Sequence, residues 1–397
     1  PLFSLASGRT EASGTASTFN TDHFTVWAPS EKHDEEGNLL FFCDMGAQAW
    51  LLLLLPVVSA TLPDQVLGMY ILLADDGDKV RATHWGGPKV GPYNSTADWT
   101  PQLHKYQQEG TNTLYFTFLN PSLMPEVPPS FANLAKSRGK STEGAVPSGT
   151  SIIFAIGGQA YSEKKMLWEW LSTKEKAVAM AKEVAKWPAK YGCDGIDLDI
   201  EAGIGDKPIT GENLVYFLAT LKELAPKMSV TQPVEGTPGN VKAPNRVLEA
   251  SYNKSKGFDA RALGSVTKVG IMDYHSAGNF VDTYVNGCSK FCSKWMCPLA
   301  VCVPAKDVVL GLTGAASAEM IAAHADDVKE RGLGGIMVWY ATVLDASTGE
   351  AGLMYQGEDA SNEKLSAWAT GLKVVRAAQG DATAQTTSLA ALEPPSL

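Results

Sequence analysis

The sequence has no surplus of basic residues and no apolar run long enough to cross a bilayer, and both absences narrow its function. Its 397 residues carry 33 lysines and arginines against 43 acidic residues, a formal charge of -10, with the basic residues scattered along the chain. Nucleic acid is therefore not an expected partner, and neither is a membrane for the mature chain. A neutral, polyhydroxylated substrate suits such a composition.

The first 60 residues differ in composition from the rest. Residues 1–44 are rich in serine, threonine, glycine and charge without any period, which indicates an upstream or disordered segment. Residues 45–60 read MGAQAWLLLLLPVVSA, a short apolar run that ends in small residues. This pattern is typical of a signal peptide with its cleavage site, so we expect a secreted, extracellular protein. The alternative is a buried apolar strand or helix.

Cysteine usage fits an oxidising compartment. Four of the six cysteines fall in one short segment: Cys288, Cys292, Cys297 and Cys302. They predict two loop disulfides of unknown pairing. A zinc site is the alternative, although the spacing lacks the tight C-x2-C pairs of common zinc modules. Sequons at Asn94 and Asn253 are usable for glycosylation if the chain is secreted.

Short β-branched or aromatic runs alternate with longer amphipathic stretches after residue 60, which indicates repeated βα units. The eight strand candidates are 65–73, 113–119, 151–156, 195–201, 228–232, 266–274, 308–312 and 335–340. Most are continuously apolar, as expected of parallel strands covered on both faces. They predict a (β/α)8 TIM barrel over residues 61–375. An open doubly wound sheet is the alternative, but no glycine-rich dinucleotide motif follows the first strand.

Helix candidates lie between these strands, at 173–191, 211–225, 317–331 and 361–375. Ser172 or Thr173 is expected to cap the first of them. The Cys-rich segment 287–304 is expected as an insertion between units 6 and 7 of the barrel. Residues 376–397, rich in alanine, threonine, serine and proline, predict a flexible tail.

The strand candidate at 195–201 carries an unusual column of acids. Residues 194–201 read DGIDLDIE. Alternation along a strand places Asp197, Asp199 and Glu201 on one face and the isoleucines and leucine on the other. Three carboxyls stacked inside a barrel cannot all ionise cheaply, so we expect protons to be shared along the column.

Glu201 lies nearest the carboxyl end of this strand, where barrel enzymes place their chemistry. A glutamate whose pKa is raised by neighbouring carboxylates can stay protonated and donate to a leaving-group oxygen. A metal site or a solvated acidic loop is the alternative. The strict interleaving with isoleucine and leucine argues against a loop, and His275 is the only nearby histidine for a metal. We expect neither a metal nor a cofactor.

The pattern Asp-x-x-Asp-x-Asp-x-Glu in 194–201 resembles the signature of glycoside hydrolase family 18, the chitinases and endo-β-N-acetylglucosaminidases. The resemblance extends over the order of elements from about residue 66 to 368. It implies that Glu201 is the general acid and then the base, that Asp199 orients the substrate's N-acetyl group, and that Asp197 shares a proton with Asp199. The nucleophile in that family is the substrate's own acetamido oxygen, so no second carboxylate is needed across the cleft.

Other segments resemble the family with departures. Gly270–His275 reads GIMDYH and is similar to the Met-x-Tyr-Asp motif. This implies that Met272 lies at the sugar and that Tyr274 steadies the oxazolinium intermediate; His275 replaces the usual aspartate. The third strand ends with Ala155 where the family's Ser-x-Gly-Gly has serine, followed by Gly157 and Gly158.

Trp339, in GGIMVW near the end of the chain, resembles the tryptophan that forms the hydrophobic floor beneath the acetamido sugar. For both Tyr274 and Trp339, an ordinary core aromatic is the alternative. Further candidate sugar contacts are Gln232 after the fifth strand and the tryptophans Trp85, Trp99 and Trp295.

These residues predict a chitinase that cleaves β-1,4 bonds between N-acetylglucosamine units, with chitin or related oligosaccharides as partners. An endo-β-N-acetylglucosaminidase acting on N-glycan cores shares the acidic signature. A chitinase-like lectin is a third alternative, because Ala155 and His275 depart from the pattern. The presence of Glu201 favours catalysis, since such lectins usually lose this glutamate.

Overall fold

The computed structural model describes residues 62–73, 110–142, 145–162, 165–201, 208–235, 242–253, 259–272, 274, 280–285, 302–313 and 316–342. It also gives the backbone of four short strands, β1 (Lys32–His33), β2 (Leu39–Leu40), β11 (Gly352–Tyr355) and β12 (Glu358–Asp359). The chain divides into two units, Pro1–Val58 and Ser59–Leu397. In the first unit, β1 and β2 pair antiparallel. The predicted signal peptide, the helix at 361–375 and the tail lie outside the described residues.

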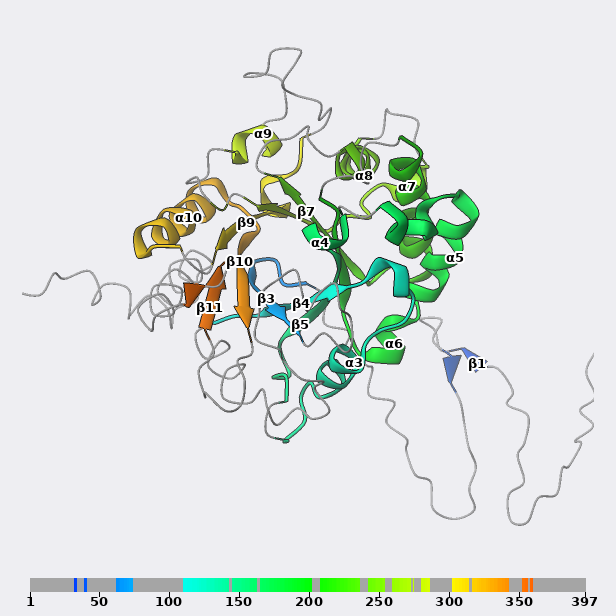
Figure 1. The fold of residues 1–397 in the computed structure, drawn as a ribbon, viewed down its shortest axis with the longest axis horizontal. Helices are drawn as coiled ribbons and strands as arrows, with labels where there is room; N and C mark the ends of the chain where they lie inside the picture. Colours follow the sequence, from blue (N-terminus) through cyan, green and yellow to red (C-terminus); the bar gives the residue numbers. More distant parts are fainter. Residues whose placement is uncertain are drawn as a thin grey trace, which may run out of the picture. The chain divides into compact units, whose positions relative to one another are not determined.

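A closed barrel of parallel strands forms the second unit (Figure 1). Its strands are β3 (Val66–Leu72), β4 (Thr113–Leu119), β5 (Ser151–Gly157), β6 (Gly195–Asp199), β7 (Ser229–Glu235), β8 (Lys268–Met272), β9 (Val308–Thr313) and β10 (Gly335–Thr342). Each pairs in parallel with the next, and β10 pairs with both β9 and β3, which closes the ring. The predicted (β/α)8 barrel is confirmed. Strand β11 extends it by pairing antiparallel with β10.

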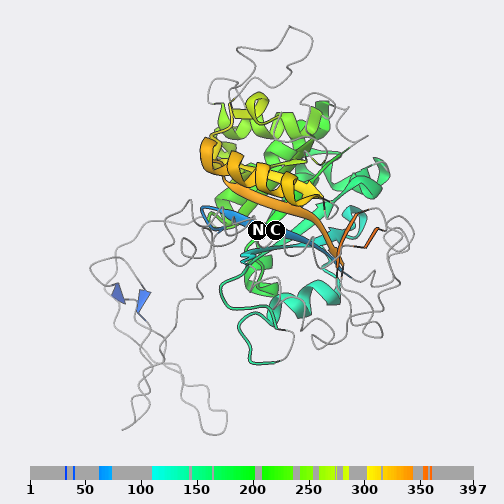
Figure 2. The same ribbon diagram turned by 90° about the vertical axis from the view of Figure 1, so that its left-hand side faces the viewer.

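Helices surround the strands (Figure 1). The described α-helices are α3 (Pro129–Lys136), α4 (Gln159–Ser162), α5 (Lys174–Val184), α6 (Trp187–Tyr191), α7 (Pro208–Leu224), α8 (Lys242–Tyr252), α9 (Val281–Val285) and α10 (Ala318–Arg331). Short 3-10 turns are η2 (Pro121–Leu123), η3 (Lys165–Leu171), η4 (Ala260–Ala262) and η6 (Ala305–Asp307). Figure 2 shows α10 alongside β10, which it contacts. Within the described residues, no helix has the length and apolarity to cross a membrane.

The predicted helix at 173–191 is two helices, so that prediction is wrong in its continuity. Thr173 caps α5 as expected, since its hydroxyl accepts a hydrogen bond from the amide of Lys176 at 3.2 Å. Helix α5 ends at Val184, and α6 begins with Pro188 in its first turn. Proline has no N–H to donate and its ring clashes with the preceding turn, so the break falls there.

Alternation along the strands divides the core into two layers. Outward-facing side chains such as Phe154 and Ile196 pack against the helices, whereas Tyr70, Tyr115 and Met337 fill the barrel interior. The end of Met337 occupies space that glycines leave open: a Cβ added to Gly270 would lie 2.5 Å from its terminal carbon. The interior is therefore packed with side chains rather than hollow.

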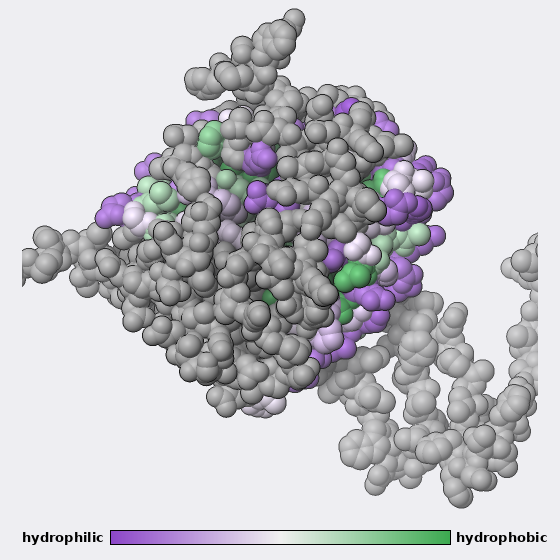
Figure 3. Space-filling view, viewed as in Figure 1, coloured by the Kyte–Doolittle hydropathy of each residue, from purple (hydrophilic) through white to green (hydrophobic). Residues whose placement is uncertain are grey.

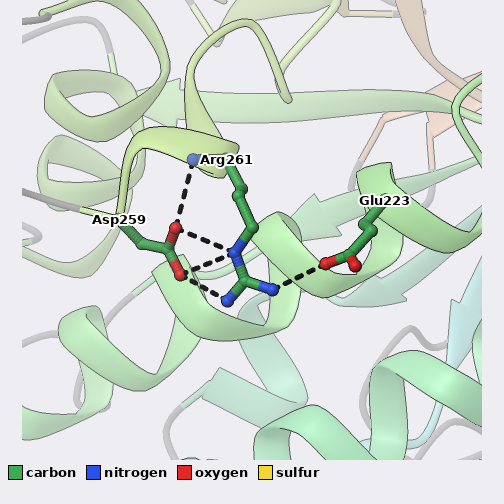
Figure 4. A network of polar contacts seen from close by, with 3 residues as sticks. All are labelled: Glu223, Asp259 and Arg261. Atoms are coloured by element: carbon green, nitrogen blue, oxygen red, sulfur yellow. Dashed lines mark hydrogen bonds and ion pairs between the residues drawn. The ribbon is translucent and has the colours of Figure 1, made fainter.

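Hydrophilic side chains gather on part of the described surface (Figure 3). Where Figure 1 places α5 and α7, the described surface in Figure 3 is mostly hydrophilic. Arg261 in η4 binds both oxygens of Asp259 and, at 2.6 Å, a carboxylate oxygen of Glu223 in α7 (Figure 4). This network links η4 to α7. Because its charges are exposed to solvent, it contributes little to the free energy of unfolding.

Candidate active site

Strand β6 carries the first two acids of the predicted column, Asp197 and Asp199. Asp197 and Asp199 are buried in the barrel interior, while Ile196 and Leu198 pack in the outer layer. The strand ends at Asp199 rather than at Glu201, since the amide of Ile200 donates to the carbonyl of Leu198 at 3.0 Å in a tight turn. Glu201 is half-buried just beyond this carboxyl end, where a barrel enzyme places its reacting groups.

Both carboxylate oxygens of Asp197 accept hydrogen bonds from other strands of the barrel: β7, which pairs with β6, and β3, which does not. The Tyr70 hydroxyl of β3 donates to Oδ2 at 3.1 Å, and the Thr231 hydroxyl of β7 donates to Oδ1. Burial raises the pKa of Asp197 to about 7, and these two donors oppose the shift because they stabilise the anion. Burial also raises the pKa of Tyr70 and of Tyr115, so both phenols stay neutral.

Asp199 is less well supplied with donors. Its Oδ1 is buried and has no hydrogen-bond partner among the residues that the structure describes. Burial first, and then the charges of Glu201 and Asp197, raise the pKa of Asp199 well above its ordinary value. Two neighbouring carboxyls in a dry site cannot both ionise cheaply, so we expect the pair to retain one proton between them.

This shared proton makes folding stability depend on pH. A carboxyl whose pKa is higher in the folded state than in the unfolded chain binds its proton more tightly when folded. Its contribution to stability is complete below the unfolded pKa of about 4 and is lost as pH rises through the folded value. Since the pKa of Asp197 is raised to about 7, we expect the free energy of unfolding to fall as pH rises across that interval.

Urea denaturation between pH 4.5 and pH 8 measures this slope. The Asp197→Asn variant is expected to show a flatter dependence than the wild type, because one raised pKa is removed. Asp326→Asn is a matched control, since Asp326 is exposed on α10 and the substitution removes the same charge at the surface. Equal slopes in the wild type and Asp197→Asn would contradict the shared proton.

Two glycines let β5 approach the acidic strand closely. Gly157 has φ +106° and pairs in register with Asp199, whose carbonyl oxygen would lie 2.2 Å from a Cβ at Gly157. Gly158, at φ +79°, donates its amide to that same carbonyl at 2.8 Å, and its Cβ position is blocked by the ring of Phe118. Only glycine has both the backbone freedom and the space for these contacts.

Gly157→Ala is therefore expected to destabilise the fold by roughly 3 kcal/mol or more, because backbone strain and a clash with fixed backbone add together. Thermal and urea unfolding measure the loss. Gly332→Ala separates the two causes: Gly332 also has positive φ, at +63°, but nothing lies within 4 Å of its Cβ position. That control is expected to cost only about 1–2 kcal/mol. Similar losses in the two variants would exclude the steric contact as the main cause.

Aromatic side chains border the column from other strands. Trp339 on β10 is 9% exposed; its ring meets the edge of Tyr70 with centroids 5.8 Å apart and tilts against Phe118 at 5.2 Å. Tyr274, half-buried two residues beyond β8, packs against the same interior cluster. Met272 is the last residue of β8 and is half-buried. The predicted aromatic residues Tyr274 and Trp339 thus lie on the same side of the barrel wall as the acids.

Gln232 lies elsewhere. It falls within β7 rather than after it, and it alternates with Thr231, which faces Asp197. Its side chain therefore points to the outer face. There the amide nitrogen donates to the carbonyls of Leu198 at 2.6 Å and Pro233 at 2.8 Å. The expected position of Gln232 in the cleft does not fit this orientation.

Several predicted residues lie outside the described part of the chain: His275, Trp85, Trp99, Trp295, Cys288, Cys292 and Cys297. Cys302 is described and exposed, and it forms no disulfide with a described residue. The Cys-rich insertion and its disulfides stay predictions.

Asp194, the first acid of the motif, is separate from the column. Its carboxylate pairs with Arg138 and accepts a hydrogen bond from the amide of Ile152 at 2.8 Å. Arg138 also donates to the carbonyls of Thr150 and Gly192. These groups surround the amino end of β6, so Asp194 holds the strand in place while the other acids face the barrel interior.

Comparison with known proteins finds similarity to this chain both in sequence and in fold. No family model matches the chain. A chitinase-like effector of Moniliophthora roreri is 29% identical over 140 residues, 31% of this chain; the match spans only 34% of that protein's length.

Solved structures of similar topology include a chitinase from Rhizomucor miehei, at 15% identity over 77% of this chain and 99% of that one, with a TM-score of 0.47. The catalytic domain of a Pyrococcus furiosus chitinase is 14% identical over 81% and 98% of the chains, with a TM-score of 0.47. A chitinase-like agglutinin from Robinia pseudoacacia is 13% identical over 78% and 99%, with a TM-score of 0.46. Over the matched 140 residues this chain is similar to a chitinase-like protein, and its acidic motif resembles the signature of glycoside hydrolase family 18.

Proposed function

We propose that this chain is a secreted glycoside hydrolase that cleaves β-1,4 bonds between N-acetylglucosamine units. The carboxyl column of β6 carries the proposal, because it ends in Glu201 at the carboxyl end of a barrel strand. The chitinase-like effector that matches part of the chain is consistent with a chitin-related ligand. Secretion rests on the apolar segment at 45–60 alone.

The proposed chemistry uses the substrate's acetamide in place of a second catalytic carboxylate. The acetamido oxygen bonds to the anomeric carbon as the glycosidic C–O bond breaks, and Glu201 gives its proton to the leaving oxygen. Water then attacks the anomeric carbon and the ring of the oxazolinium opens, while the Glu201 carboxylate takes up a proton from the water. Two displacements at one carbon retain the anomeric configuration.

The surrounding residues have distinct roles in this scheme. Asp199 orients the acetamide, and its negative neighbour Asp197 offsets the positive charge that develops on the oxazolinium. Tyr274 stabilises the intermediate through its hydroxyl, while Trp339 offers a flat apolar face to the sugar's C–H bonds. Electrostatic interactions are stronger inside a dry barrel than in water, so a few groups are enough to stabilise the charged intermediate.

Hydrolysis assays test the proposal. Purified protein is incubated with N-acetylglucosamine oligomers and, separately, with a high-mannose glycopeptide, and the products are separated by chromatography. Cleavage of the oligomers supports the chitinase. Cleavage of the glycopeptide alone would assign the endo-β-N-acetylglucosaminidase activity instead.

A chitinase-like lectin is the second candidate, and Ala155 favours it. Ala155 is fully buried beside Asp197, so β5 offers no hydroxyl to the column. Tight binding of N-acetylglucosamine oligomers with no product from the wild type would establish the lectin and exclude the enzyme.

A further inference from the structure

Three neighbouring strands meet at the level of Asp197. Strand register places Ala155 of β5 on one side of Asp197 and Thr231 of β7 on the other. All three residues are buried in the barrel interior. Either flanking position could present a hydroxyl to the carboxylate, but only Thr231 has one, and it donates to Oδ1.

The second contact of the Thr231 hydroxyl is weak by comparison. The carbonyl of Ile196 lies 3.5 Å away, at the outer limit of a hydrogen bond. The Tyr70 hydroxyl serves Oδ2 of Asp197 at 3.1 Å. Each oxygen of Asp197 therefore has its own donor, and each donor comes from a different strand.

The two acids of the pair differ in this respect. Asp197 has two hydroxyl donors, whereas Oδ1 of Asp199 has no partner among the described residues. A shared negative charge is more stable on the carboxylate with more donors, and the proton is more stable on the other. Among the described residues, Tyr70, Tyr115 and Glu201 are titratable groups that interact with the pair; at this level β5 and β7 contribute Ala155 and Thr231, neither of which titrates.

We propose that Thr231 is a positioning residue for the reaction, whose hydroxyl holds the shared negative charge on Asp197 and so keeps the proton on Asp199. It supplies from β7 the hydroxyl that Ala155 does not supply from β5. This role rests on the proposed hydrolase function, because it is exercised when Asp199 orients the acetamide. The departure at Ala155 is thereby compensated within the same layer of the barrel.

Three variants test the role through the pH dependence of kcat on N-acetylglucosamine tetramer. Thr231→Val keeps the shape and removes the hydroxyl; kcat is expected to fall roughly 10-fold, the lower end of the range for a hydrogen bond to a charged group. The apparent pKa of the acidic limb of its pH–kcat profile is expected to rise by about one unit, because the Asp197 carboxylate loses a hydrogen-bond donor. Thr231→Ser keeps the hydroxyl and is expected to behave like the wild type.

The double variant Thr231→Val/Ala155→Ser returns a hydroxyl from the opposite neighbour and is expected to recover part of the rate and the original limb. A purely structural role for Thr231 would change the unfolding temperature without moving the pH limb, and serine at 155 would not rescue it. If Thr231→Val does not fold, Thr231→Ala gives the same comparison with a smaller side chain.

The outcomes separate this role from the function on which it rests. A wild type that hydrolyses the tetramer, with an unchanged rate and pH limb in the hydroxyl-free variant, overturns the role of Thr231 and leaves the hydrolase proposal standing. A wild type without activity overturns the hydrolase proposal. In that case the role of Thr231 is tested by following the infrared band of the protonated carboxyl as pH rises, with the band assigned by its change in Asp197→Asn. The band is expected to persist to higher pH in Thr231→Val than in the wild type. An unchanged titration rejects the role.

Discussion

Replacing Glu201 by glutamine is expected to lower kcat on N-acetylglucosamine oligomers by roughly 10³-fold, within the range of general acid–base catalysis. Glutamine keeps the shape of the side chain but has no proton to give to the leaving oxygen. Glu201 lies half-buried just past the carboxyl end of β6, beyond the fully buried pair below it. Oligomer binding, measured by calorimetry, is expected to change little, because the substitution removes the transferable proton and leaves the shape of the binding surface unchanged.

Asp194→Asn is the matched control for this variant. It changes an acid of the same motif that pairs with Arg138 at the amino end of the strand. We expect a loss of stability of about 3 kcal/mol, because Arg138 is left without its charged partner, with kcat per folded molecule close to the wild type. Turnover by Glu201→Gln at the wild-type rate would exclude Glu201 as the general acid.

Asp199→Asn is expected to reduce kcat by roughly 10²-fold, because an amide neither carries the shared proton nor holds the acetamide in the attacking orientation. The effect should fall on kcat more than on KM, since orientation matters most when the acetamido oxygen reaches the anomeric carbon. Steady-state kinetics on the tetramer measure both constants. The substitution is close to isosteric at a site whose Oδ1 has no described hydrogen-bond partner.

Asp197→Asn provides the comparison for Asp199→Asn. It removes the charge one step deeper in the column, where Tyr70 and Thr231 donate to the carboxylate. A smaller loss of kcat is expected there, because Asp197 acts through Asp199. If Asp199→Asn retains full kcat while Asp197→Asn loses it, the division of roles between the two acids is reversed.

The barrel was predictable because its strands are buried on both faces. Each strand reads as a short apolar run, and all eight predicted runs overlap the observed strands β3 to β10. Helix continuity was harder to predict. The amphipathic pattern of 173–191 continues across the break at residues 185–186, but Pro188, inside the predicted helix, is a sequence signal for this break that the prediction did not use.

Within the site, the column itself follows from alternation along one strand, so Asp197 and Asp199 were predictable from their spacing. Their partners were not. Tyr70 is 127 residues from Asp197 and Thr231 is 34 residues away. The Thr231 contact depends on the register of β7 against β6, and the Tyr70 contact depends on closure of the barrel, which brings β3 and β6 to face the same interior. Gln232 shows the same limit, since a single position along β7 decides whether a side chain faces the acids or the helices.

Proton NMR of freshly formed product tests whether the substrate's acetamide takes part in the hydrolysis. The wild type is mixed with N-acetylglucosamine tetramer, and the anomeric signals of the new reducing end are recorded before mutarotation. Substrate-assisted catalysis led by Glu201 predicts that the β-anomer appears first and later equilibrates with the α-anomer. Initial release of the α-anomer, or no product at all, would contradict this account of the chain.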